Sequence, residues 1–195
     1  AWGAALIGHA HPKVLEAASA AAANGANFGA VNRLMVELAE RIADISPCVE
    51  RIRFVASGTE ADEMAVMLAW CKTGSTEIIA LRNGYAGRSM LAQSLTGHSP
   101  WRVIPTQIPG VKHAMEPYCY RCPLGATPDN CGMACAQDIE RLIQYTTTGQ
   151  IAGFLAEPVQ GVGGFVVPPK DYFKVAVEII KKYGGLFIAD EVQTG

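Results

Sequence analysis

The amino-acid sequence predicts an α/β fold, in which a mostly parallel sheet is covered by helices on both faces. Short, uniformly apolar segments occur at residues 77–82, 151–157 and 186–190, and segments with helical periodicity lie between them. Parallel strands that are buried on both faces have this composition, and regular strand–helix alternation predicts a parallel sheet. Ligands of such folds bind at the carboxyl ends of the strands, so functional residues are expected there.

Each predicted helix has its own signal. Residues 11–25 have a proline near the start and a glycine at the end, as many helices do. Leu34, Leu38, Ile42 and Ile45 follow one another at three- and four-residue intervals, which is typical of an amphipathic helix. A short strand is predicted at 51–57. Further helices are predicted at 59–71, 135–147 and 168–185, and another ends at about residue 95.

Composition limits the possible functions. The 195 residues are 50% hydrophobic and 17% charged with a formal net charge of −2, which gives no reason to expect nucleic acid or a membrane as partner. No apolar run approaches the ~20 residues of a membrane span, and the first residues do not form a signal peptide, so we expect a cytoplasmic protein. The two ends of the chain are typical of a fragment. We expect residues 1–50 to belong to a smaller domain and residues 51–195 to form the first part of a larger domain, with a Cys-rich insertion at about 113–135.

Residues 57–60, "SGTE", follow a predicted strand and begin a helix. Free N–H groups and the helix macrodipole favour an anion at such a place, most often phosphate. Gly58 would let the backbone approach the anion closely, and Thr59 would add a hydroxyl donor. An ordinary helix cap by Ser57 or Thr59 has the same pattern, so both interpretations are open.

Two other strand ends carry candidates. Tyr85 and Arg88 follow the segment 77–82 and offer a flat face for a ring and a guanidinium for a carboxylate or phosphate. A turn with a packed tyrosine would look the same. Glu157 ends the segment 151–157, where an unpaired carboxylate is costly to bury. It therefore meets a cation, orders the site, or is a surface glutamate.

Asp190 follows four apolar residues, so we expect it to be half-buried beside a positive partner or a metal. A protonated ring nitrogen would be such a partner. Val192 could pack on the face of that ring, and Gln193 could hydrogen-bond a ligand hydroxyl.

Four cysteines form two close pairs, Cys119 with Cys122 and Cys131 with Cys135. The gaps of two and three residues match the ligand spacing of structural zinc sites with four thiolates, although the loop between the pairs is short. Disulfides and free thiols in an insertion are the alternatives.

Together and in this order, the motifs resemble those of class III pyridoxal-phosphate (PLP) aminotransferases of fold type I. The segments that carry the resemblance are "GHAHPKV", "SGTEADE", "GYAGR", "AEPVQG" and "FIADEVQTG". They cover nearly the whole chain outside the Cys-rich insertion, and within the family they look nearest to bacterial members of the alanine–glyoxylate type.

The resemblance implies a role for each matching residue. Gly58 and Thr59 would bind the cofactor phosphate, Tyr85 would stack on the pyridine ring, and Val192 would support its other face. Asp190 would keep the ring nitrogen protonated, so that the ring acts as an electron sink.

The resemblance also implies roles around the cofactor. Gln193 would bond its phenolic oxygen, Glu157 would be an acid behind the cofactor or on the substrate side, and Arg88 would hold a substrate carboxylate. The whole enzyme would be a homodimer that passes an amino group from a small-molecule donor to a 2-oxo acid.

The sequence departs from the family pattern at three points. Ala86 stands where the family usually has His, and Val162 stands where some relatives have Glu. The lysine that binds the cofactor covalently lies further along in the family than this chain reaches, so we expect the chain alone to be inactive. Alternatives are another PLP reaction (decarboxylase, phospho-lyase or aminomutase) or a zinc-stabilised, non-catalytic binding module.

Overall fold

The computed structural model describes residues 5–105 and 107–195. These residues divide into two compact units, residues Ala5–Ala56 and Ser57–Gly195. The assignment of residues 1–50 to a smaller domain and of 51–195 to a larger one stays a prediction.

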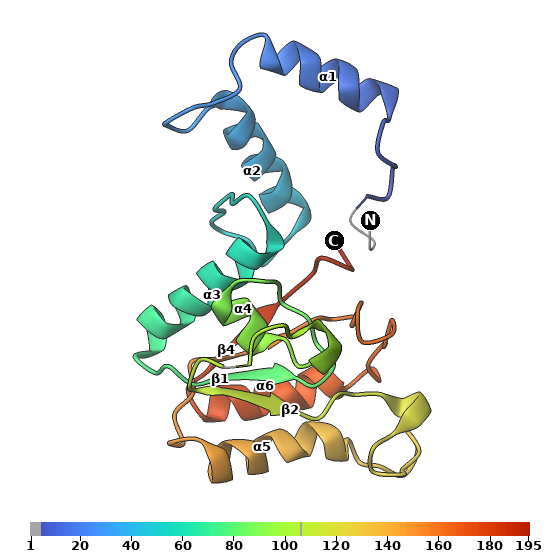
Figure 1. Cartoon of the computed structure of the whole chain (residues 1–195). Coiled ribbons are helices and arrows are strands. Elements are labelled where there is room, and N and C mark those ends of the chain that lie inside the picture. Colours follow the sequence, from blue (N-terminus) through green and yellow to red (C-terminus); the bar gives the residue numbers. More distant parts are fainter. Residues whose placement is uncertain (1–4, 106) are drawn as a thin grey trace. The chain divides into compact units, whose positions relative to one another are not determined.

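The larger unit contains the predicted parallel sheet. Its strands are β1 (Ile78–Leu81), β2 (Val111–Ala114), β3 (Gly153–Ala156) and β4 (Leu186–Ala189), in the spatial order β2-β1-β3-β4. All three strand pairs are parallel. Figure 1 shows helices on both faces of the sheet, which confirms the α/β fold.

Alternate residues of each strand enter two separate cores, because successive side chains of a strand point to opposite faces. Ile79, Leu81 and Phe154 pack with α5 (Ala134–Thr146) and α6 (Tyr172–Lys182). Ile78 and Ala80 pack with α3 (Gly58–Thr73) and α4 (Met90–Leu95). The sheet is thus covered on both faces, and its strand ends have a fixed position.

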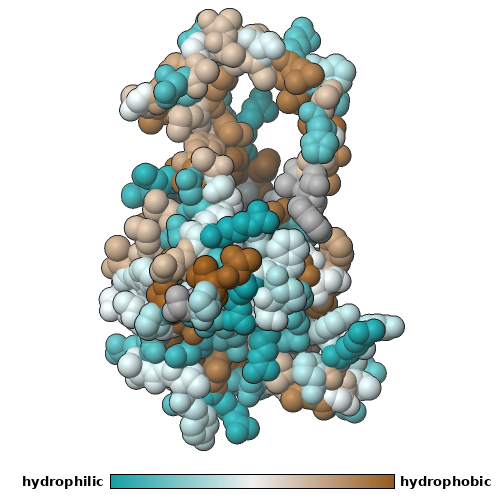
Figure 2. All heavy atoms as spheres, viewed as in Figure 1, coloured by the Kyte–Doolittle hydropathy of each residue, from teal (hydrophilic) through white to brown (hydrophobic). Residues whose placement is uncertain are grey.

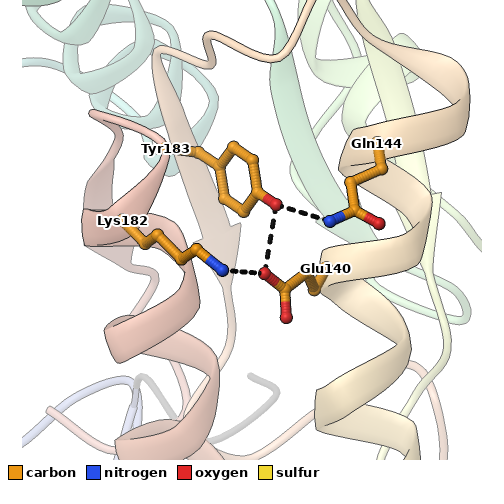
Figure 3. A network of polar contacts seen from close by, with 4 residues as sticks. All are labelled: Glu140, Gln144, Lys182 and Tyr183. Atoms are coloured by element: carbon orange, nitrogen blue, oxygen red, sulfur yellow. Dashed lines mark hydrogen bonds and ion pairs between the residues drawn. The ribbon is translucent and has the colours of Figure 1, made fainter.

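Helices α5 and α6 are also joined by polar side chains (Figure 3). Lys182 Nζ pairs with Glu140 Oε1, which also accepts a hydrogen bond of 3.0 Å from the Tyr183 hydroxyl. Gln144 Nε2 donates to the same hydroxyl at 2.9 Å. The hydrogen bond from Lys182 lowers the pKa of Glu140, and the same contact raises the pKa of Lys182. Because the ammonium group lies in solvent, we expect the pair to add little stability.

Three expectations about the strands were wrong. Residues 51–57 form no strand, since none of the sheet's described strands pairs with them and a strand requires a hydrogen-bonded neighbour. Strand β2 lies where only a Cys-rich insertion was expected, because Lys112 and His113 hide its signal. Strand β4 was expected to be buried on both faces. It is exposed along most of its length, because it is at an edge of the described sheet.

The smaller unit contains α1 (Pro12–Ala22) and α2 (Arg33–Ile45), as the sequence predicted. The Asn32 side chain caps α2 by accepting a 3.0 Å hydrogen bond from Met35 N. Neither helix has a buried residue among those described. Side chains such as Leu15, Leu34 and Leu38 are exposed, and Figure 2 shows apolar colours over both helices. No described helix of the chain has the length and apolarity needed to cross a membrane.

Candidate active site

A cavity of about 450 Å³ lies in the larger unit, where the carboxyl ends of β1, β3 and β4 meet the start of α3. Roughly 300–1,000 Å³ is usual for small-molecule sites. Its lining includes eight residues singled out from the sequence: Gly58, Thr59, Tyr85, Arg88, Glu157, Asp190, Val192 and Gln193. The cavity also includes Asp62, Ala86, Gly87, Trp101, Gly161 and Val162.

The start of α3 forms one wall. Ser57 caps the helix, its hydroxyl accepting a 3.2 Å hydrogen bond from Glu60 N. The first turn of a helix leaves N–H groups without intrahelical acceptors, and here that turn borders the cavity. Gly87 lies so close that a Cβ added to it would be 2.1 Å from Thr59 Oγ1. The structure thus shows the cap at Ser57 and places Gly58 and Thr59 in the lining of the cavity, and phosphate binding at this turn stays a prediction.

The loop after β1 forms a second wall and is held by buried polar groups. Ala86 N donates to Thr96 Oγ1 at 3.1 Å, and Gln93 Nε2 donates to the Gly87 carbonyl at 2.9 Å. The Tyr85 ring meets Trp101 edge to face, with 5.7 Å between the ring centroids. This loop therefore presents an ordered aromatic surface.

Glu157 joins two loops of the cavity. Its Oε1 accepts a 2.9 Å hydrogen bond from Tyr85 N, and its Oε2 accepts one of 2.7 Å from Gly161 N. Burial raises the pKa of Glu157, the two N–H groups oppose that rise, and Asp190 adds to it. Of the interpretations left open by the sequence, the structure therefore supports a glutamate that orders the site.

Asp190 lies directly after β4 and is buried, with 9% of its surface exposed. Its Oδ1 accepts a 3.2 Å hydrogen bond from Val192 N. Burial raises the pKa of Asp190, and this hydrogen bond opposes the rise. Gln193 lies beside the Glu157 loop, since a Cβ built on Gly161 would be 3.0 Å from Gln193 Oε1. Arg88 is exposed at the rim.

Asp62 was not recognised from the sequence as a residue of this site. Its side chain lines the cavity and only 7% of the residue is exposed. Burial raises its pKa to about 8, with Asp190 and Glu157 contributing further. Its place three residues after Thr59 was the available signal, because residues at that spacing share a helix face.

The predicted zinc site is not assembled. No group of three or more His, Cys, Asp or Glu side chains within residues 5–105 and 107–195 could hold a metal ion. Cys119, Cys122, Cys131 and Cys135 are free thiols around a separate small cavity. Burial raises the pKa of the Cys119 and Cys135 thiols.

Comparison with known proteins matches the chain to one protein family and to several relatives. The family described as "Aminotransferase class-III" matches residues 1–195. Alanine–glyoxylate aminotransferase 2 homolog 2, mitochondrial, of Arabidopsis thaliana is 40% identical over 96% of this chain and 39% of its own length. Glutamate-1-semialdehyde 2,1-aminomutase of Legionella pneumophila (strain Corby) is 34% identical over 100% of this chain and 43% of its own.

A solved structure matches as well. An amine transaminase from an uncultivated Pseudomonas species, crystallised in its PLP-bound form, has a TM-score of 0.86 and 32% identity. The match covers 100% of this chain and 47% of the transaminase. The chain therefore spans less than half the length of these three proteins.

Proposed function

Because the chain belongs to the class III aminotransferase family, we propose that the full-length protein uses PLP to transfer an amino group from an amino acid or amine to a 2-oxo acid. The observation that carries the proposal is the cavity, where the start of α3, the Tyr85 ring and the buried Asp190 carboxylate meet. Fold and family agree with the sequence-based expectation, and PLP is the cofactor that the family implies.

The residues present fit PLP. The start of α3 offers N–H groups to a phosphate. Asp62, Glu157 and Asp190 line the cavity, and none of them forms an ion pair within the described part of the chain. A buried carboxylate normally has a positive partner, which a protonated pyridine nitrogen beside Asp190 would provide. When bound, PLP supplies a conjugated ring that accepts electron density from the substrate α-carbon.

We assign the protein groups accordingly. Gly58 and Thr59 would bind the phosphate, and Asp190 would keep a proton on the ring nitrogen. Tyr85 and Val192 would pack against the ring and exclude water from it. Each group lines the cavity, which supports the assignment.

The remaining predicted residues act around the cofactor. Gln193 would donate a hydrogen bond to the phenolic oxygen. Glu157 holds the loops of Tyr85 and Gly161 by its two hydrogen bonds. Arg88, exposed at the rim, binds a substrate carboxylate. No described residue of the lining is a lysine, so we expect no covalent cofactor adduct at a lysine of this chain.

A second candidate is amino-group migration within one substrate. The 34% identity with an aminomutase favours it, and Asp190 and the start of α3 would serve both reactions. We also propose a homodimer, which the exposed apolar side chains of α1 and α2 support. A cytoplasmic location stays a prediction, because the Arabidopsis relative is named mitochondrial.

The test is made on the full-length protein loaded with PLP. We expect it to convert amino acids or amines together with pyruvate or glyoxylate into the corresponding amino and oxo products. We expect Asp190→Asn to weaken cofactor binding about 10²–10⁴-fold, since losing one partner of a buried charge pair costs roughly 3–5 kcal/mol. Amino-group migration without an acceptor would favour the second candidate, and failure to bind PLP would overturn both.

A further inference from the structure

Among the residues that line the cavity, Asp62 is the buried titratable group that the proposed function leaves without a role. It follows Gly58 and Thr59 by four and three residues in α3, and all three line the cavity. Only 7% of Asp62 is exposed. The side chains with a charge or titratable group that share the cavity with it are Tyr85, Arg88, Glu157 and Asp190.

The three carboxyl groups of the cavity differ in how well they are stabilised as anions. Glu157 accepts two backbone hydrogen bonds and Asp190 accepts one. Asp62 accepts none from the described residues, and it forms no ion pair with them. Hydrogen bonds to an ionised carboxyl favour its ionised form, and nearby like charges oppose it. Asp62 is therefore the group of the three that retains a proton most readily.

The position of Asp62 gives a second reason for a neutral group. One helical turn, about 5.4 Å, separates it from the N–H groups at the start of α3. An ionised Asp62 would place a negative charge near the phosphate proposed to bind there, whereas a protonated one would not. The pKa of Asp62, raised by burial to about 8, agrees with this.

We propose that Asp62 is a positioning residue that keeps its carboxyl proton at neutral pH and presents a neutral O–H donor to the cavity that it shares with the Asp190 carboxylate. The inference rests on the proposed function, because it concerns the pocket in which Asp190 faces the cofactor ring. A neutral Asp62 adds no further negative charge that would oppose the ionisation of Asp190. Raising the pH removes that proton and adds a negative charge that opposes the cofactor phosphate.

The first test is infrared spectroscopy of the full-length protein without cofactor. We expect a carbonyl band of a protonated carboxyl at pH 7 that is absent in Asp62→Asn and disappears in the wild type as the pH rises through about 8. Asp129→Asn, at an exposed position, should leave the band unchanged. If Asp62→Asn does not fold, Asp62→Ser replaces it, and the pH titration of the wild-type band still tests the proposal. Absence of the band in the wild type at pH 7 would overturn it.

The second test is the affinity for PLP as a function of pH, read from tryptophan fluorescence. At pH 7 we expect Asp62→Asn, which keeps a donor, to bind within about threefold of the wild type, and Asp62→Ala to bind on the order of tenfold more weakly. At pH 9 we expect Asp62→Asn to bind on the order of tenfold more tightly than the wild type, because it gains no charge. Equal pH profiles for both would contradict the proposal. Failure of every variant to bind PLP would instead reject the proposed function, which the infrared test does not require.

Discussion

Replacing Glu157 by Ala is the most direct test of how the cavity is held together. The substitution removes the acceptor for Tyr85 N and Gly161 N, whose hydrogen bonds measure 2.9 and 2.7 Å. Each buried N–H left without a partner costs about 1–3 kcal/mol, so the local cost is about 2–6 kcal/mol. Glu157→Gln keeps one acceptor oxygen and should cost about half as much.

Hydrogen–deuterium exchange of the full-length protein measures this cost directly, because exchange at an amide reports its local opening free energy. In Glu157→Ala we expect the amides of Tyr85 and Gly161 to exchange about 30-fold faster or more, since 1.4 kcal/mol corresponds to a factor of ten. Glu178→Gln, on the exposed side of α6, serves as the control and should leave both rates unchanged. If Glu157→Ala changed both rates less than about threefold, the carboxylate would not hold these loops.

Three further results are expected. Gly87→Ala should destabilise the protein by about 1–3 kcal/mol and weaken phosphate binding, because its Cβ would meet Thr59 Oγ1 at 2.1 Å. Denaturation and phosphate titrations measure the two effects. Gly164→Ala is the control for backbone strain, because φ is also positive there but the space around it is open. In urea denaturation without cofactor, the wild type should lose stability relative to Asp62→Asn as the pH rises from about 4 to about 8, because the folded protein then binds more protons than the unfolded one. The difference between the folded and unfolded pKa of Asp62 limits this loss of unfolding free energy to about 6 kcal/mol. Parallel stability curves for the two proteins would refute the prediction. Lys182→Met should leave the denaturation midpoint nearly unchanged, since the ammonium group is exposed, and a large loss would show that the pair matters.

Much of the fold could be predicted because buried parallel strands have a distinctive composition. Strands β1 and β3 are buried at every residue, and both were expected. Strand β2 was missed because it lies at an edge, where Lys112 and His113 are tolerated. A segment such as 51–57 forms a strand only where a partner strand is present, and a sequence pattern does not identify the partner.

The cavity was predictable where strand ends supply its residues, as at Tyr85, Glu157 and Asp190. Asp62 was missed because acidic residues near a helix start are favourable in any case. Its burial depends on the contacts of α3 with α4, β3 and β4, which local sequence does not encode. The zinc prediction failed for a similar reason, since correct spacing does not bring the thiols into one coordination sphere.

The exposed edge of β4 has a practical consequence. Leu186 and Phe187 are 39% and 36% exposed, and no other strand of the described residues pairs with the outer side of β4. An open apolar edge is a template for strand addition between molecules. Preparations of this 195-residue chain by itself should therefore self-associate in a concentration-dependent way. Phe187→Lys should reduce the light scattering of such preparations, and an unchanged signal would place the adhesive surface elsewhere.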